Sequence, residues 1–271
     1  RRAGLPTFEP TRLKHLETQI ARYLSRPGNA RFSAESVSVV SYGTGPGALG
    51  DYDASTHLQG ELIGTMLDMV VRDATAGRRS MDDVLRVMLE RFSGPQGFTR
   101  VGVERAVHDV CGCEVHRFFE RQVRGANPLD FDRYLRLAGL ALMVTWSPAV
   151  NDSARPLPDL RVFSWDPPDG QGAQLLLTDP AGGWGKAGLH TGDRIGTANG
   201  VPIRTAAEFR DFRNRLQLGD TVRIEVERPK ATARASFVIA GFDRPTVRIE
   251  EIENVTEKRR LIRAAWLAGR P

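Results

Sequence analysis

Residues 179–203 read DPAGGWGKAGLHTGDRIGTANGVPI, a stretch in which glycine recurs every few positions between short apolar segments. Glycine tolerates the backbone conformations of tight turns, so this spacing indicates a chain that turns often. Just beyond it, Thr205 and Glu208 have the spacing of a capping box, which predicts the start of a helix. Phe209 and Phe212 then recur at helical spacing, so the stretch leads into an amphipathic helix.

Short β-type runs flank this stretch on both sides. They lie at residues 160–163, 174–177, 221–227 and 235–239. Apolar runs of this length between turn residues are typical of strands. The sequence therefore predicts a small, partly open β-structure with one main helix over residues 159–243.

The first 145 residues predict helices instead. Apolar residues recur at helical spacing from Leu13 to Leu24, and Ser80 with Asp83 forms an acidic variant of the capping box before another amphipathic segment. Further helices are expected at about residues 56–76, 99–110, 114–123 and 128–137. Between the first two helices, residues 28–55 are rich in glycine and serine and predict a long irregular loop, which in a compact domain tends to be functional or mobile.

Proline-rich segments divide the chain. The polar segment SPAVNDSARPLPD predicts a linker over residues 146–158, and a second proline-containing connector precedes the amphipathic helix of TEKRRLIRAAWLAG. We therefore expect an α+β protein with a helical subdomain over residues 1–145, the β-structure over 159–243, and a tail with a final helix over 244–271.

The net charge of +5 arises from 38 basic and 33 acidic residues that are interleaved along the chain. A nucleic-acid-binding face needs clustered positive charge, which this pattern does not supply. The longest apolar run, LAGLALMVTW, has about half the length that crosses a bilayer. We expect no nucleic-acid partner and no membrane span, and a soluble protein of either the cytoplasm or the periplasm.

Four potential zinc ligands lie close together in HDVCGCEVH, namely His108, Cys111, Cys113 and His116. Cys-x-Cys spacing is unusual for structural zinc, and Gly112 falls where one helix must stop and the next must start. A disulfide between the two cysteines would close a badly strained small loop. The segment therefore predicts an inert helical corner with two free thiols and no metal.

Signatures of catalysis are missing from the sequence. GTGPGALG, from Gly43, neither follows a strand nor ends in Lys-Ser or Lys-Thr, so it does not predict a phosphate-binding loop. The histidines, at positions 15, 57, 108, 116 and 190, include no pair four residues apart, so the zinc motif H-E-x-x-H is absent. We expect no metal site and no cofactor in this chain.

The glycine-rich stretch, the capped helix and LGDTVRIEVER closely resemble the bacterial PDZ pattern P-A-x-x-A-G-L-x-x-G-D-x-I-x-x-x-N-G. The resemblance implies that Leu189 fills the core and that Gly192-Asp193 starts the next strand. PDZ domains add an extended peptide beside a sheet edge and receive its carboxylate on loop amides. The implied peptide-binding residues are Leu160, Arg161, Val162, Phe163, Phe209 and Phe212.

This implied groove departs from the usual pattern. Asp159 brings a negative charge to the expected carboxylate position, and Pro158 lacks an amide donor. We therefore expect weak binding of C-terminal peptides, in the high micromolar range or about −5 kcal/mol. The domain is expected mainly to pack against its own helical neighbour.

The helical part resembles the C-terminal half of the catalytic unit in the glycyl aminopeptidase family, zinc exopeptidases with a thermolysin-like fold and a trailing PDZ domain. The similar segments are RAGL, RPGNARFSAES, GRRSMDDVLRVMLERF and FFERQVRGANPLDFDRYLRLAGL, and RIEEIENVTEKRRLIRAAWLAG resembles the family's tail. The family's β-rich domain, H-E-x-x-H helix and third zinc ligand would lie before Arg1. The resemblance implies a C-terminal portion of a larger peptidase, with zinc in the longer protein if it is active.

Within this resemblance, STHLQG aligns with a segment that usually reads Tyr-Tyr, any residue, then Lys-Gly. In related aminopeptidases the tyrosine three positions before that glycine donates a hydrogen bond to the tetrahedral oxyanion, and three before Gly60 is His57. The resemblance implies this catalytic role for His57. Because His57 and Gln59 replace tyrosine and lysine, the alternative is a polar helix-start residue in an inactive relative.

The leading hypothesis is part of a zinc-dependent aminopeptidase-like protein that removes N-terminal residues, with glycine favoured by the resemblance. Its partners would be a peptide or protein substrate and the upstream catalytic domain of the same protein. This chain alone is expected not to hydrolyse peptides. The alternative is a non-catalytic scaffold whose PDZ domain docks peptides or proteins, and an H-E-x-x-H motif upstream of Arg1 would distinguish the two.

Overall fold

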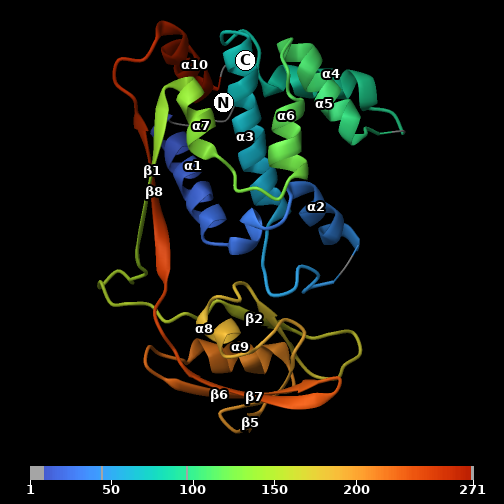
Figure 1. Ribbon diagram of the computed structural model, residues 1–271, viewed down its shortest axis with the longest axis vertical. Coiled ribbons are helices and arrows are strands. Elements are labelled where there is room, and N and C mark those ends of the chain that lie inside the picture. Colours follow the sequence, from blue (N-terminus) through green and yellow to red (C-terminus); the bar gives the residue numbers. More distant parts are fainter. Residues whose placement is uncertain (1–8, 44, 96, 270–271) are drawn as a thin grey trace.

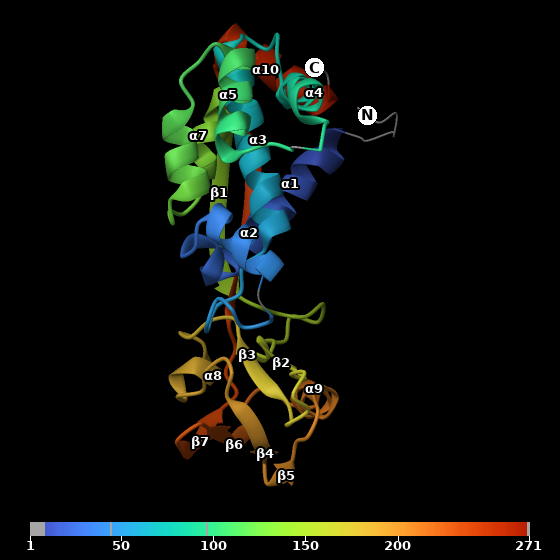
Figure 2. The ribbon, with the colours of Figure 1, turned by 90° about the vertical axis from the view of Figure 1, so that its right-hand side faces the viewer.

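The computed structural model describes residues 9–43, 45–95 and 97–269. Helices gather at one end of an elongated molecule and a smaller β-rich unit lies at the other, with a two-stranded ribbon running along one side between them (Figure 1). The view from the side shows the same two units, one above the other (Figure 2). The α+β class expected from the sequence is confirmed, with the helical unit first in the chain and the β-rich unit second.

The central element of the helical unit is α3 (Thr56–Ala74), which contacts helices from both ends of the chain (Figure 1). Its neighbours are α1 (Glu9–Leu24), α2 (Ala34–Gly43), α4 (Met81–Phe92), α5 (Arg100–Cys111), α7 (Phe131–Leu135) and α10 (Glu257–Ala268). Leu62, Met66 and Met69 are buried among them. Because α3 buries side chains on several faces, its position is fixed by packing as well as by its own helical propensity.

Local capping chemistry sets two helix starts where the sequence predicted them. The backbone N–H of Ser80 donates to Oδ2 of Asp83 at 2.9 Å, and the Ser80 hydroxyl accepts from the first turn of α4, so the capping box is present. The hydroxyl of Thr99 accepts a hydrogen bond from the Gly102 N–H at 3.1 Å at the start of α5. These bonds satisfy amides that a helix leaves unpaired at its N-terminus.

The prediction of a long irregular loop over residues 28–55 is partly wrong. The structure places a 3₁₀ turn, Pro27–Ala30, and the helix α2 within it. The hydroxyl of Ser33 accepts from the Ser36 N–H at 3.1 Å, and Val37 is fully buried. The helix forms because Ser33 caps it and Val37 anchors it, a short signal that the surrounding glycines and serines obscure.

The segment after α5 also departs from the sequence prediction. The helix expected over residues 114–123 consists of a short α6 (His116–Phe118) followed by a π-helical segment, η2 (Phe119–Arg124). The next helix, α7, begins after Asp130 rather than at Pro128, because the Asp130 carboxylate accepts from the Arg133 N–H at 3.3 Å. A 3₁₀ turn, η3 (Arg136–Ala138), then leads to the first strand.

A long ribbon occupies two segments for which the sequence predicted no strand, namely the end of the expected helical subdomain with the start of the expected linker, and the proline-containing connector before the last helix. Strand β1 (Leu140–Pro148) pairs antiparallel with β8 (Asp243–Glu251), so that Leu140 lies opposite Glu251. Val247 and Ile249 are buried, and β8 packs along α1. The N–H of Ile249 donates to Oε1 of Glu17 on α1 at 2.9 Å. The strands form because the two segments meet each other and because β8 meets α1. These contacts join residues far apart along the chain and leave no local pattern.

The β-rich unit is an open sheet with the strand order β2-β3-β4-β6-β7, and the short β5 pairs with β4. The strands are β2 (Val162–Trp165), β3 (Gln174–Leu177), β4 (Arg194–Ala198), β5 (Val201–Pro202), β6 (Thr221–Arg228) and β7 (Ala231–Val238). Its helices are α8 (Gly183–Lys186) and α9 (Ala206–Asn214), and α9 has the capping box predicted for Thr205 and Glu208. Leu189 is buried at 1% exposure, as the resemblance implied.

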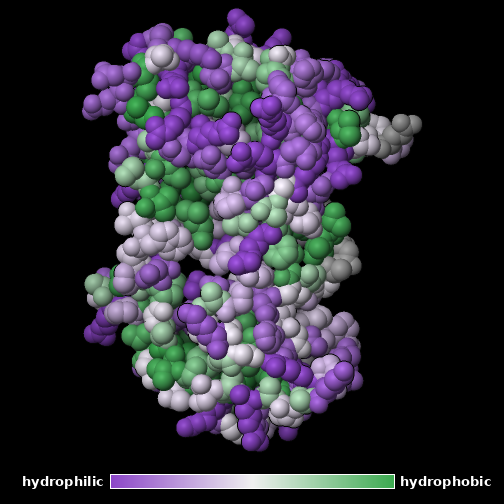
Figure 3. Space-filling view, in the orientation of Figure 1, coloured by the Kyte–Doolittle hydropathy of each residue, from purple (hydrophilic) through white to green (hydrophobic). Residues whose placement is uncertain are grey.

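The two units have separate hydrophobic cores and touch at their facing ends. In the space-filling view a hollow lies between them on the side of the ribbon, and polar side chains cover much of this face (Figure 3). Among the described residues, no helix combines the length and the apolar character needed to span a bilayer.

Candidate functional site

His57 lies in the first turn of α3 with its ring exposed at the mouth of a recess of about 510 Å³. The recess is lined by Arg26, Ser41, Asp53, Ala54, Ser55, Thr56 and His57. Arg26 and Asp53 form an ion pair across it at 3.2 Å, and the hydroxyls of Ser41 and Thr56 are 2.9 Å apart. The site therefore combines one titratable ring with hydroxyl groups and a paired cation.

The start of α3 is fixed by a cap at Ser55. Its hydroxyl accepts a hydrogen bond from the Leu58 N–H at 3.3 Å, and its own N–H donates to Oδ1 of Asn29 at 3.1 Å. The N-terminal end of a helix carries a partial positive charge, which favours a negative group nearby. His57 thus lies where an anion would be stabilised.

Asn29 is a positioning residue that the sequence interpretation missed. It is 2% exposed, and its amide group donates to the Tyr23 carbonyl at 3.1 Å while its oxygen holds Ser55. At the neighbouring Gly28, a Cβ atom would overlap the carbonyl of Asp53, so the turn and the loop are in close contact. The motif RPGNARFSAES contains both residues, and this contact gives a physical reason for the glycine and the asparagine.

Tyr23 supports the same turn from α1. Its hydroxyl donates to the Asn29 carbonyl at 3.0 Å and accepts from the Leu129 N–H at 3.2 Å. Burial raises the pKa of Tyr23, and the bond from Leu129 opposes this only in part. The phenol therefore stays neutral at neutral pH and keeps its proton for the bond to Asn29.

Gln59 lies below the recess rather than in it. It is 2% exposed, and its amide nitrogen donates to the Asn29 carbonyl at 3.0 Å. Its Oε1 has no hydrogen-bond partner among the described residues. Gln59, which replaces the family's lysine, therefore supports the turn at Asn29. Of His57 and Gln59, only His57 is exposed to solvent.

The β-rich unit contacts the loop that forms one side of this recess. Oδ1 of Asp51 accepts from the Thr191 N–H at 2.6 Å, and Oδ2 lies 2.7 Å from Nδ1 of His190. Gly47, with φ of +88°, approaches the Thr191 side chain so closely that a Cβ there would lie 2.9 Å from it. Asp51 precedes Asp53 of the recess by two residues, so the β-rich unit holds the loop that reaches the site.

Two of the six predicted peptide-binding residues, Leu160 and Arg161, precede β2. Val162 and Phe163 lie on β2, and Phe209 and Phe212 lie on α9, which contacts β2. The six residues differ in exposure. Val162 and Phe209 are fully buried, whereas Phe163 is 49% exposed. The guanidinium of Arg213 donates to the Val162 carbonyl at 2.6 Å and lies over the Phe163 ring. Arg213 therefore covers part of the edge along which a peptide strand would pair, and the peptide-binding role remains a prediction.

The backbone amides of the loop before β2 already donate hydrogen bonds within the protein. The N–H groups of Asp159, Leu160 and Val162 donate to backbone carbonyls at 2.8–3.0 Å, and that of Arg161 donates to Oδ1 of Asp159. The guanidinium of Arg161 makes two further bonds to the Asp159 carboxylate, each of 2.9 Å. A peptide carboxylate would find these amides engaged, and the charge of Asp159 is already paired.

We therefore expect C-terminal peptides to bind the β-rich unit weakly, with a Kd in the high micromolar range, or about −5 kcal/mol. Calorimetry with a panel of C-terminal peptides measures this. Because Phe209 is fully buried and its substitution would disturb the core, the suitable control is the exposed Phe163 in a Phe163→Asp variant. A peptide that binds below about 1 μM, or roughly −8 kcal/mol, and is lost in Phe163→Asp would contradict the prediction.

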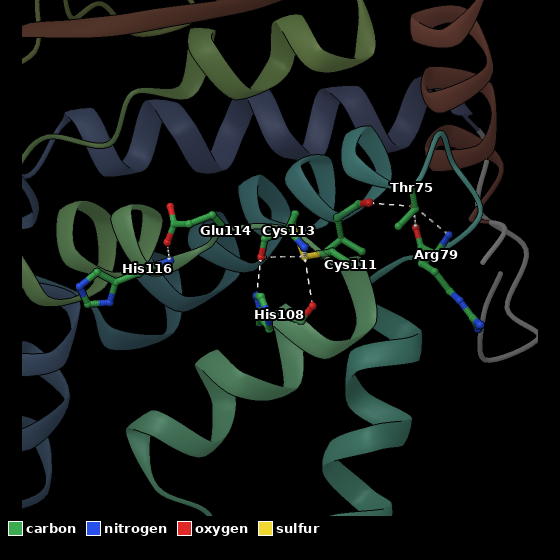
Figure 4. The surroundings of a disulfide bond; sticks show 8 residues. Thr75, Arg79, His108, Cys111, Cys113, Glu114 and His116 are labelled. Atoms are coloured by element: carbon green, nitrogen blue, oxygen red, sulfur yellow. Dashed lines mark hydrogen bonds between the residues drawn. A yellow bond between two sulfur atoms is a disulfide. The ribbon is translucent and has the colours of Figure 1, made fainter.

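The prediction of two free thiols is wrong, because Cys111 and Cys113 form a disulfide (Figure 4). Gly112 adopts a left-handed conformation with φ of +60° and brings the two Cα atoms to 5.1 Å. This separation lies within the range of about 4.4–6.8 Å that disulfides span. The turn at the end of α5 thus brings the two cysteines to a separation that a disulfide can span.

The two nearby histidines have other partners. Nδ1 of His108 lies 2.8 Å from the Cys113 carbonyl, and Nδ1 of His116 lies 2.8 Å from Oε1 of Glu104. No group of three histidine, cysteine or carboxylate side chains suited to a metal occurs in the described ranges 9–43, 45–95 and 97–269. That purified protein carries no stoichiometric zinc remains a prediction.

No protein-family model matches this chain, and neither does any curated protein. Among solved structures it is similar to an aminopeptidase N family protein from Idiomarina loihiensis, with a TM-score of 0.56 and 18% identity over 94% of this chain. The chain shares that protein's fold. It covers only 44% of the length of that structure. At this identity the likeness speaks for the fold alone.

A second solved structure is similar to part of the chain. It is the PDZ domain of HtrA3 bound to a phage-derived ligand, FGRWV. The match covers 40% of this chain and 92% of that domain, with 16% identity and a TM-score of 0.25. A score this low supports no argument about the β-rich unit.

Proposed function

We propose that this chain is the helical and PDZ-like portion of an aminopeptidase-like protein that removes N-terminal residues from peptides, glycine among them. The fold shared with an aminopeptidase N family protein supports the general class. The observation that carries the proposal is the exposed His57 ring at the N-terminal end of α3, in a recess of peptide-sized volume. It occupies the position of the oxyanion-binding tyrosine in the resemblance.

In this proposal His57 donates a hydrogen bond to the oxyanion that develops when a peptide carbonyl is attacked. A preorganised donor aimed at developing charge is among the largest contributions that a side chain makes to catalysis. The partial positive charge at the start of α3 acts in the same direction. The hydroxyls of Ser41 and Thr56 would bind neighbouring polar groups of the peptide.

Zinc would supply the activated water in an active member of the resembling family. The described residues of this chain do not gather three side chains suited to hold a metal. Following the resemblance, we propose that the zinc ligands and the general base belong to the rest of a longer protein, and that this chain contributes the recess and His57.

We propose further that the PDZ-like unit binds the helical unit of its own chain and does not recruit separate peptides. Its amides before β2 are engaged, whereas its Thr191 and His190 bind Asp51 on the loop beside the recess. The unit would thus hold the wall of the site instead of recruiting peptides.

A non-catalytic scaffold is the second candidate. The observation that favours it is the burial of Gln59, which aligns with a lysine of the resembling family. Because Gln59 is buried, no side chain at this position enters the recess. A scaffold would retain the recess as a peptide-binding surface without hydrolysis.

Hydrolysis of glycyl-p-nitroanilide tests the proposal. The longer protein that contains this chain is expected to release nitroaniline, and a chelator is expected to abolish the release. This chain alone, loaded with zinc, is expected to give no rate above a chelated control. A longer protein that binds peptides without cleaving them would support the scaffold, and cleavage by the isolated chain would overturn the division of roles.

A further inference from the structure

The disulfide between Cys111 and Cys113 lies at the corner between α5 and α6, and the proposed peptidase function gives it no role. Cys111 is the last residue of α5 and is 8% exposed, whereas Cys113 is half-buried beyond the left-handed Gly112 (Figure 4). Only Gly112 separates the two cysteines along the chain. Cys113 is therefore the more exposed of the two cysteines, although it also packs against the core of the helical unit.

A bond across one residue contributes little to global stability. In the chain-entropy model the stabilisation from a disulfide shrinks with the length of the loop that it closes. The corner has other supports: the Gly112 N–H donates to the His108 carbonyl at 2.8 Å, and Val115 is 2% exposed. The folded helical unit therefore does not depend on the bond, and the bond can open without global unfolding.

The surroundings of Cys111 accommodate both redox states. In the disulfide, the Cys113 N–H lies 3.2 Å from Sγ of Cys111, where it can also stabilise a departing thiolate. In the reduced state, the Cys111 thiol would have the Cys113 and His108 carbonyls as acceptors at 3.6 and 3.8 Å. The buried Cys111 thiol formed on reduction would thus have acceptors within reach.

We propose that Cys111 and Cys113 form a reversible thiol–disulfide site that exchanges with dithiol reductants, and that its state controls the order of the corner between α5 and α6. A thiolate of the reductant attacks Sγ of Cys113, and the bond between the two cysteine sulfurs breaks. Sγ of Cys111 leaves as a thiolate and takes a proton from water. The reductant's second thiolate then displaces Cys113, which takes a second proton, and the reductant leaves as its own disulfide.

The corner adjoins a second surface of the helical unit. Val103 on α5 and Phe119 and Val123 on η2 line an apolar recess of about 490 Å³ between these elements, α2 and α3. Glu104 on α5 also pairs with His116 and Arg124. Burial alone would raise the pKa of Glu104, but hydrogen bonds from Arg124 and His116 lower it, so the carboxylate stays charged at neutral pH. These pairs keep α5 and η2 in contact when the bond opens, so the expected change is local.

Reduction of the native chain by millimolar dithiothreitol tests the site. We expect two thiols to become titratable without denaturant. The reduced protein should remain folded and should still unfold in one cooperative transition when denaturant is added. Amide hydrogen exchange should rise about tenfold at residues 112–124 and stay unchanged in α1 and α10. Oxidised glutathione should restore the original pattern.

A double variant, Cys111→Ser with Cys113→Ser, is the matched control, because dithiothreitol should not alter its exchange. If this variant does not fold, the reoxidation of the natural chain provides the same control. A bond that resists reduction until urea unfolds the protein would overturn the proposal. Reduction that leaves exchange at residues 112–124 unchanged, or that unfolds the whole helical unit, would overturn it as well.

Discussion

His57→Ala in the longer protein is expected to lower kcat on glycyl-p-nitroanilide about 100-fold, because removal of one donor to an oxyanion typically has an effect of this size. KM should change little, since the bond forms mainly in the transition state. Steady-state kinetics measures both quantities. His57→Tyr should retain much of the activity, because a phenol also donates a hydrogen bond.

The matched control for His57 is His15→Ala. His15 is also an exposed histidine of the helical unit, and its ring pairs with Glu61 outside the recess. We expect this variant to keep its kcat within about twofold, since exposed ion pairs contribute little. Equal losses in the two variants would point to a general effect on folding, and an unchanged kcat in His57→Ala would remove His57 from the mechanism.

Asp68→Ala is expected to lower the free energy of unfolding by about 3–5 kcal/mol, the usual cost of removing one partner from a buried ion pair. Arg72 on α3 is fully buried, and its Nε lies 3.0 Å from Oδ2 of Asp68. Oδ1 of Asp68 also accepts from the Met81 N–H at 2.8 Å, at the start of α4. Urea denaturation measures the change.

The matched control is Asp109→Ala, which removes the aspartate of an exposed pair. Asp109 lies 2.6 Å from Arg91, and both side chains are more than a third exposed. We expect a loss of less than about 1 kcal/mol. A double variant, Asp68→Leu with Arg72→Met, should lose less than Asp68→Ala, because no charge is then left buried. A loss below about 1 kcal/mol in Asp68→Ala would show that the pair does not hold α3 and α4 together.

The candidate site could be located from the sequence only in outline. His57 was proposed because it aligns with a tyrosine of the resembling family, three residues before Gly60, and the structure places it in the first turn of α3. Asn29 and Asp51 were missed, because their roles depend on Ser55 and Thr191, which lie far from them along the chain. The disulfide was mispredicted for a different reason: the separation of the cysteines depends on the left-handed conformation of Gly112, which sequence spacing alone does not specify.

By itself, the sequence determined the elements whose causes are local. The cap at Ser80, the cap at Thr205 and the apolar face of α3 each act within one or two turns of chain, so their residues can be recognised side by side. Only the tertiary structure decided the pairing of β1 with β8 and the contact of Asp51 with the β-rich unit. Such contacts form because the packed cores bring distant polar groups to the same place, where unpaired donors and acceptors would be costly.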